Sequence, residues 1–233
     1  MADILVVDDD ESIRDAVSFH MRKEGHDVTA AKDGSEALEK HGRQRFDLII
    51  LDIMMRGYSG FEVCSAIRDK DPSIPIIMLS AKGDLVDKSL GFKLGADDYI
   101  TKPFEPAELA MRVNSCLRRS RVYSQGVQQV KAEGAGTVEL GDLQIDIRVR
   151  QVSARGNRVD LTTREFDILA YLAQCPNTTF TRQQILDAVW GCESYSSPGV
   201  IAVFIRKLRE KIEKDPSKPE HIITDWGVGY RIV

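Results

Sequence analysis

The stretch Asp47-Leu-Ile-Ile-Leu-Asp52-Ile-Met-Met55 decides the fold of the first half of the chain. Its apolar run, Leu48–Leu51, has no polar position, which is typical of a strand buried on both faces of a parallel sheet. Asp52 follows directly, at the carboxyl end of this strand. Functional groups of open α/β sheets gather at that edge. The stretch therefore predicts a layered α/β fold with a site at one edge of its sheet.

Comparable apolar runs recur on both sides of this stretch, at intervals that leave room for helices. They are Ile4–Val7, Val28–Ala31, Ile74–Leu79 and Tyr99–Ile100. The segments between them are amphipathic, with apolar residues at helical spacing. We therefore predict a five-stranded, doubly wound parallel sheet of the flavodoxin type, with helices on both faces.

The second half of the chain has a different pattern. Val138–Val159 alternates apolar and polar residues, which predicts a small antiparallel sheet. Capping boxes at Thr162 and Thr181 predict two helix starts. A third helix over about 198–214 and a hairpin up to Val233 complete an α+β winged-helix domain.

Composition and charge agree with two domains. The 233 residues are 42% hydrophobic and 29% charged, an ordinary globular mixture. We predict a first domain over 1–120, a linker rich in glycine and glutamine over 121–137, and a second domain over 138–233. Residues 1–120 carry a net charge of −5 and residues 121–233 a net charge of +1, so the overall −4 does not exclude a nucleic-acid partner.

Location and redox state follow from what the sequence lacks. No apolar run approaches the roughly 18 residues of a membrane helix, and the N-terminus has no basic region of a secretory signal. The four cysteines form no Cys-x-x-Cys pair. We expect a cytoplasmic protein with reduced thiols, no zinc site and no membrane contact.

Polar residues follow four of the predicted strands. Asp8-Asp9-Asp10 ends the first, Asp52 the third, Ser80 the fourth and Lys102 the fifth. Clustered carboxylates need a compensating cation, and Mg²⁺ prefers oxygen ligands. The cluster predicts phosphoryl transfer to an aspartate nucleophile. The alternative for each aspartate alone is a turn or helix N-cap role.

Four segments in the right order resemble the signature of a response-regulator receiver domain. They are Val6–Asp9, Asp47–Met55, Ile76–Lys82 and Gly95–Phe104. The second half is similar to the winged-helix output domain of the OmpR/PhoB family. The resemblance implies a two-component regulator, not a metabolic enzyme, that a sensor histidine kinase phosphorylates. It also implies a homodimer that binds tandem half-sites in double-stranded DNA and regulates transcription, with RNA polymerase as a further partner.

The resemblance also assigns roles in the receiver. Asp52 would accept the phosphoryl group, and Asp9, Asp52 and the Met54 carbonyl would bind Mg²⁺, with Asp8 acting through water. Ser80 and Lys102 would contact the phosphoryl group, and Tyr99 would be an aromatic switch that turns inward with Ser80. Arg56 departs from the pattern, because the family usually has proline there.

Segment 84–119 carries charges of both signs, which permits a twofold interface. The resemblance implies that this face forms the active dimer, with Lys88–Glu108 and Asp98–Arg112 as pairs between the two copies. Asp97 and Arg119 would join the same surface. The alternative is a solvated helix face.

The third helix of the second domain is predicted to enter DNA. Its basic residues Arg206, Lys207, Arg209 and Lys211 are expected to be exposed and to neutralise phosphates. Val203 would contact a thymine methyl group, and Lys207 a guanine. Thr224 and Trp226 would be the wing contacts, although Trp226 stands where the family carries arginine. The alternative is a generic basic surface helix.

Three other functions are alternatives to this interpretation, and the sequence argues against the first two. A phosphatase or phosphotransferase would want a second acid at position 54, where Met54 stands. A flavodoxin-like cofactor binder needs a loop that holds phosphate after the first strand, and Asp8-Asp9-Asp10 would repel phosphate. A regulator that dimerises and binds DNA without phosphorylation is the remaining alternative.

Overall fold

The computed structural model describes residues 1–81, 85–125, 136–191 and 197–233, with side chains for all of these except 85–89 and 118–125. The chain divides into two compact units, Met1–Arg119 and Ser120–Val233. Each unit is described by itself. Among the described helices, none combines the length and apolarity needed to cross a bilayer.

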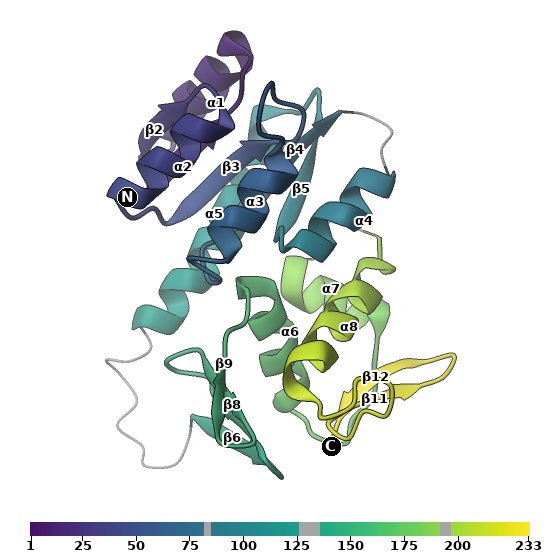
Figure 1. Ribbon diagram of the computed structural model, residues 1–233. Helices are drawn as coiled ribbons and strands as arrows, with labels where there is room; N and C mark the ends of the chain where they lie inside the picture. The colour runs from purple at the N-terminus through teal and green to yellow at the C-terminus, as the bar shows by residue number, and fades with distance from the viewer. Residues whose placement is uncertain (82–84, 126–135, 192–196) are drawn as a thin grey trace. The chain divides into compact units, whose positions relative to one another are not determined.

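The first unit is built on a parallel sheet with the strand order β2-β1-β3-β4-β5 (Figure 1). The strands are β1 Asp3–Val7, β2 Asp27–Ala31, β3 Leu48–Asp52, β4 Ile76–Ala81 and β5 Asp98–Lys102. The helices are α1 Glu11–Lys23, α2 Gly34–Arg43, α3 Gly60–Arg68, α4 Leu85–Leu94 and α5 Pro106–Gln125. The predicted doubly wound parallel sheet is confirmed.

Apolar packing places helices on both faces of this sheet. Alternate residues of β1 and β3 share one buried cluster with α1 and α5, and its members include Ile4, Val6, Val17, Met21, Leu48, Ile50, Leu109 and Val113. Helices α2, α3 and α4 contact one another in sequence along the opposite face. Both faces of the central strands are therefore dry, which is why these strands read as unbroken apolar runs.

The second unit has two small sheets around three helices (Figure 1). The strands are β6 Thr137–Leu140, β7 Leu143–Asp146, β8 Gln151–Ala154, β9 Asn157–Val159, β10 Phe180–Thr181, β11 Ile222–Asp225 and β12 Gly229–Ile232. The helices are α6 Thr163–Ala173, α7 Arg182–Trp190 and α8 Val200–Ile212. Strands β6 to β9 form an antiparallel meander, and β10-β12-β11 is the sheet of the hairpin. The winged-helix prediction is confirmed.

Both predicted capping boxes are present. Thr162 accepts a hydrogen bond from the Glu165 N–H, and the Glu165 carboxylate accepts one from the Thr162 N–H. Thr181 and Gln184 repeat this arrangement at the start of α7. These reciprocal bonds satisfy amide groups that the helix itself cannot pair.

The segment predicted as a linker is partly regular structure. Helix α5 continues to Gln125, and β6 begins at Thr137. Residues 121–125 contain no glycine or proline, so nothing in them stops the helix before Gly126. The middle of the predicted linker, 126–135, lies outside the described residues.

Candidate functional site

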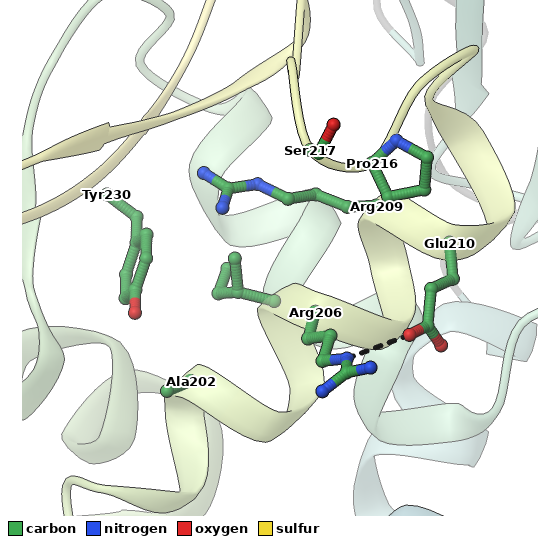
Figure 2. Close-up of a pocket in the computed structure, with 8 residues that line it drawn as sticks. Ala202, Arg206, Arg209, Glu210, Pro216, Ser217 and Tyr230 are labelled. Atoms are coloured by element: carbon green, nitrogen blue, oxygen red, sulfur yellow. Dashed lines mark hydrogen bonds and ion pairs between the residues drawn. The ribbon is translucent and has the colours of Figure 1, made fainter.

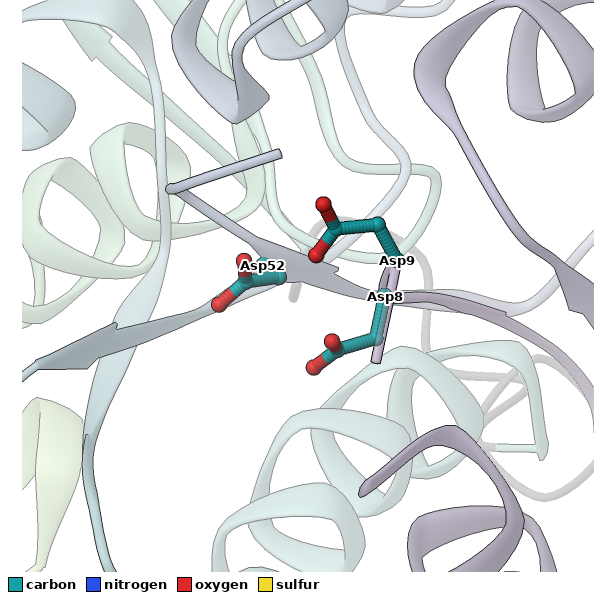
Figure 3. Close-up of side chains that lie close together, drawn as sticks. All are labelled: Asp8, Asp9 and Asp52. Carbon is teal, nitrogen blue, oxygen red and sulfur yellow. The ribbon is translucent and has the colours of Figure 1, made fainter. Parts of the chain in front are cut away.

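Three carboxylates meet at the carboxyl edge of the parallel sheet (Figure 3). Asp8 follows β1 and Asp52 ends β3, and these strands pair directly with Val7 opposite Leu51. Asp9 is the next residue along the chain, and one carboxylate oxygen from each of the three lies within 4.8 Å of the others. The predicted cluster therefore forms. Asp10 is different, because its carboxylate caps α1 by accepting from the Ser12 and Ile13 N–H groups.

Lys102 lies between two of these carboxylates. Its Nζ is 2.5 Å from Asp52 Oδ1 and 2.8 Å from Asp8 Oδ2. Burial raises the pKa of Asp8, against the hydrogen bond from Lys102, which lowers it. Burial alone would lower the pKa of Lys102, but its bonds to Asp52 and Asp8 outweigh burial and raise that pKa. Lys102 is therefore a charged counter-ion to two buried acids.

Asp9 is held by the loop that follows β3. Its Oδ2 accepts a hydrogen bond from the backbone N–H of Arg56, at 3.2 Å. The Met54 and Arg56 side chains are exposed. The sequence shows that Arg56 replaces the usual proline, but it does not indicate this bond from the Arg56 amide, because a backbone bond leaves no residue-type signal.

Ser80 is the penultimate residue of β4, and it is buried, with 2% exposed. Its Oγ has no hydrogen-bond partner among the described residues. Leaving a buried hydroxyl unsatisfied is unfavourable by about 1–3 kcal/mol. A ligand that accepts a hydrogen bond from the Ser80 hydroxyl would remove this penalty. Carboxylate oxygens, an ammonium group and an unsatisfied hydroxyl fit Mg²⁺ together with a phosphoryl group.

Tyr99 occupies an inward position on β5, and only 5% of it is exposed. Its hydroxyl donates to Met78 Sδ at 3.1 Å, on the neighbouring strand β4. The ring meets Phe92 of α4 edge to face, with 4.8 Å between ring centroids.

Helix α8 and the hairpin surround an open pocket of about 450 Å³ (Figure 2). Arg206 is 78% exposed at the side chain and donates to Glu210 at 2.9 Å. Val203 is half-buried, and Trp226 at the hairpin turn is 91% exposed. An exposed arginine on α8 and an exposed indole on the hairpin are thus available to a partner.

Known proteins share both units. Residues 4–114 match the family described as response regulator receiver domain, and residues 156–232 match the family described as transcriptional regulatory protein, C terminal. The response regulator DrrB of Thermotoga maritima, an OmpR/PhoB homologue, is 36% identical, with 100% of this chain and 99% of that chain covered and a TM-score of 0.52. This chain belongs to the OmpR/PhoB family of response regulators.

Two further solved structures are similar to this regulator, one over the whole chain and one over about half of it. A mutant of RitR is 26% identical over 100% of this chain and 99% of that one, with a TM-score of 0.80. The receiver domain of the Francisella response regulator 1452 is 37% identical over 52% of this chain and 99% of that one, with a TM-score of 0.50.

The prediction that Asp97 of this response regulator lies on an exposed dimer surface is wrong. Asp97 is fully buried, and its Oδ2 accepts from Arg68 at 2.7 Å and from the Ile76 N–H at 2.8 Å. Asp97 and Asp98 are consecutive residues, and consecutive extended residues face opposite sides of a sheet. Asp97 therefore holds α3 to the sheet instead of lying on a surface.

The other predicted pairs are engaged within one chain. Arg112 donates to Asp98 at 2.7 Å and to Glu108 at 3.0 Å, and Arg112 and Asp98 are both buried. In this regulator, then, α5 is tied to β5 by these ions. The side chains of Lys88 and Arg119 lie outside the described residues.

Three of the four basic residues predicted to reach DNA point elsewhere. Lys211 Nζ is 2.7 Å and Lys207 Nζ 3.6 Å from the buried carboxylate of Glu165. Arg209 donates to the Ile222 carbonyl at 2.6 Å and to Thr224 Oγ1 at 2.7 Å. The expectation of four exposed cations is therefore corrected to one, Arg206, and Thr224 supports the hairpin from α8.

Glu165 is the residue that the sequence reasoning undervalued. The capping box marked it as a helix partner, and it is also the buried anion that attracts Lys207 and Lys211. A buried carboxylate needs hydrogen bonds and a cation, which a basic helix packed against α6 supplies.

Proposed function

We propose that this regulator controls transcription through phosphorylation of Asp52 by a sensor histidine kinase. The observation that carries the proposal is the Asp8–Lys102–Asp52 arrangement, together with the unsatisfied hydroxyl of Ser80 near the carboxyl end of the adjacent strand β4. A single acid would fit many roles. Two acids bridged by an ammonium group, with an unsatisfied hydroxyl near the end of the adjacent strand, fit a phosphoryl group that is added and later removed.

In the proposed reaction an Asp52 oxygen attacks the phosphorus of the phosphohistidine, and the phosphorus–nitrogen bond breaks. Asp9, Asp52 and the Met54 carbonyl would hold Mg²⁺, with Asp8 acting through water, and the ion would neutralise charge on the transferring group. Lys102 supplies a second positive charge, and the Ser80 hydroxyl donates to a phosphoryl oxygen.

The phosphoryl group would bias the position of Ser80 and Tyr99, and so the surface formed by α4, β5 and α5. We propose that two copies associate there and place two winged-helix domains on tandem half-sites in double-stranded DNA. Arg206 and Trp226 would then contact DNA, and Val203 would lie near the bases. RNA polymerase would be a further partner of the DNA-bound dimer.

The proposed DNA affinity depends on dimerisation. Lys207, Arg209 and Lys211 are paired with groups of their own domain, so α8 offers few charges to phosphates. Since each neutralised phosphate contributes to affinity, one domain alone should bind weakly and two together should bind well.

One observation favours a second candidate, a regulator that dimerises and binds DNA without phosphorylation. Tyr99 is already inward in the unmodified chain, held by Met78. A switch residue that needs no phosphoryl group to turn inward would give a constitutively active surface.

The test is incubation with acetyl phosphate and Mg²⁺, wild type against Asp52→Ala. Intact mass and sedimentation are read on the same samples, and DNA binding is measured alongside. We expect wild type to gain the mass of one phosphoryl group, dimerise and bind DNA more tightly, and Asp52→Ala to do none of these. No mass gain on wild type overturns the proposal, and dimers that form equally in both proteins favour the second candidate.

A further inference from the structure

Gly91 in α4 faces the hydroxyl end of Tyr99. A Cβ atom built on Gly91 would lie 1.2 Å from Tyr99 Oη and 2.5 Å from Tyr99 Cζ. It would also lie 3.0 Å from Met78 Sδ, the acceptor of the Tyr99 hydroxyl. No pair of atoms tolerates the first two distances, so Tyr99 and a side chain at position 91 exclude each other.

The backbone does not explain this glycine. Gly91 lies within α4, and its φ is not in the left-handed region where glycine is favoured. In a helix interior, glycine is less stable than alanine by roughly 1 kcal/mol. The packing explains this glycine instead, because the space that a side chain would need is occupied by atoms of Tyr99.

We propose that Gly91 is the positioning residue for Tyr99, because the missing side chain creates the slot in which the inward ring lies. Met78 closes the end of this slot and accepts the hydroxyl hydrogen bond, and Phe92 forms its side wall. Any side chain at position 91 fills the slot and drives Tyr99 outward. The identity of residue 91 thus decides whether the inward position exists at all.

The slot is separate from the carboxylate cluster. The hydroxyl of Tyr99 bonds to Met78 in the slot. Lys102 instead bonds to Asp8 and Asp52 at the carboxyl edge of the sheet. The consequence for signalling rests on the proposed function. A chain with a filled slot should still accept a phosphoryl group on Asp52 and should fail to convert it into dimerisation.

The direct test measures the exposure of Tyr99. Nitration by tetranitromethane is followed residue by residue by peptide mass spectrometry, with the half-exposed Tyr58 as the internal reference. Wild type should nitrate Tyr99 slowly relative to Tyr58. Gly91→Ala should raise the Tyr99 rate, relative to Tyr58, at least tenfold.

Gly42→Ala is the matched control. Gly42 also lies in a receiver helix, α2, and a Cβ built there meets no atom within 4 Å. This variant should leave Tyr99 nitration unchanged. If Gly91→Ala nitrates Tyr99 at the wild-type rate, or if Gly42→Ala raises that rate equally, the proposal is wrong.

Destabilisation of Gly91→Ala would also be informative. Its change in Tm is measured in the wild-type background and again in a Tyr99→Ala background. Since the exclusion is between these two residues, a loss of Tm in the first background should disappear in the second. A loss that persists without Tyr99 contradicts the proposal.

Phosphorylation separates this inference from the proposed function. With acetyl phosphate and Mg²⁺, Gly91→Ala should gain one phosphoryl mass like wild type and remain a monomer in sedimentation. If wild type gains no mass, the proposed function fails, while the nitration result still decides the role of Gly91. If phosphorylated Gly91→Ala dimerises like wild type with Tyr99 exposed, its role in coupling is refuted.

Discussion

At the scale of the residue, Lys102 determines the charge balance of the cluster. It bridges Asp52 and Asp8, two acids that are almost fully buried. An uncompensated buried charge is strongly destabilising, so the acids depend on this one ammonium group when no metal is bound.

We predict that Lys102→Gln lowers the free energy of unfolding by about 3 kcal/mol without Mg²⁺, because it leaves two buried carboxylates facing each other. Added Mg²⁺ should restore part of this loss. Urea unfolding with and without Mg²⁺ measures both effects. Lys93→Gln, at an exposed position of α4, should change neither, and a Lys102→Gln protein as stable as wild type would refute the assignment.

A second prediction concerns the backbone amide of Arg56, which donates a hydrogen bond to Asp9. Proline has no N–H, so Arg56→Pro removes the bond to Asp9, whereas Arg56→Ala removes only the side chain. Groups that hold metal ligands support metal affinity. We expect Arg56→Pro to weaken Mg²⁺ binding about fivefold, on the basis of roughly 1 kcal/mol for one hydrogen bond, and Arg56→Ala to change it less than twofold.

Calorimetric Mg²⁺ titration of the three proteins distinguishes amide from guanidinium. Equal losses in both variants would show that the side chain, not the N–H, matters for the metal. Wild-type affinity in Arg56→Pro would show that the Asp9 carboxylate does not need this bond.

At the scale of the element, α8 divides its basic residues between two tasks. Arg206 is exposed, and Arg209 holds the hairpin by bonding to Ile222 and Thr224. One face of the helix is therefore open to a partner, and another face holds the domain together.

This division predicts different responses to salt. Arg206→Ala should reduce the slope of log affinity for DNA against log salt by about 1, because one phosphate contact is lost. Arg209→Ala should keep the slope and lower Tm instead. Arg158, an exposed arginine of β9, is the control, and Arg158→Ala should alter neither quantity. A reduced slope in Arg209→Ala would mean that this side chain reaches DNA after all.

At the scale of the whole molecule, the ion pairs of Arg112 on α5 affect how two copies of the chain could associate. Arg112 is already paired with Asp98 and Glu108 in the single chain. Association at this face would exchange ion pairs instead of creating them. Leu90 of α4 and Met111 of α5 are large apolar side chains that are exposed. The proposed dimer should therefore depend on apolar contact.

We predict that dimerisation of the phosphorylated protein changes less than threefold when the ionic strength rises from about 0.1 M to about 1 M, which shortens the Debye length from about 10 Å to about 3 Å. Sedimentation at both salt concentrations measures it. A loss of tenfold or more at high salt would instead indicate new ion pairs between the copies.

The strands and the cluster could be predicted because burial and strand ends leave direct marks on the sequence. Leu48–Leu51 reads as a doubly buried strand, and Asp52 stands where that strand ends. Whether a charged side chain turns to solvent or to a buried partner leaves no such mark. Lys207 and Lys211 have the spacing of an exposed face, yet Glu165 of another helix attracts them.

The same limit applies to Asp97 and Arg56. Two adjacent aspartates look alike in sequence, yet both are buried on different partners, Asp97 on Arg68 of α3 and Asp98 on Arg112 of α5. The bond from the Arg56 amide depends on loop geometry. Tertiary contacts, not residue types, settle these positions.

The lysine that bridges Asp8 and Asp52 also makes folding of the receiver independent of metal binding. A site balanced by its own ammonium group does not require an ion for the chain to reach its native state. We therefore expect newly made receiver to fold without added magnesium. Under the proposed function, the supply of the ion would govern when phosphorylation starts and would not govern how much folded protein is present.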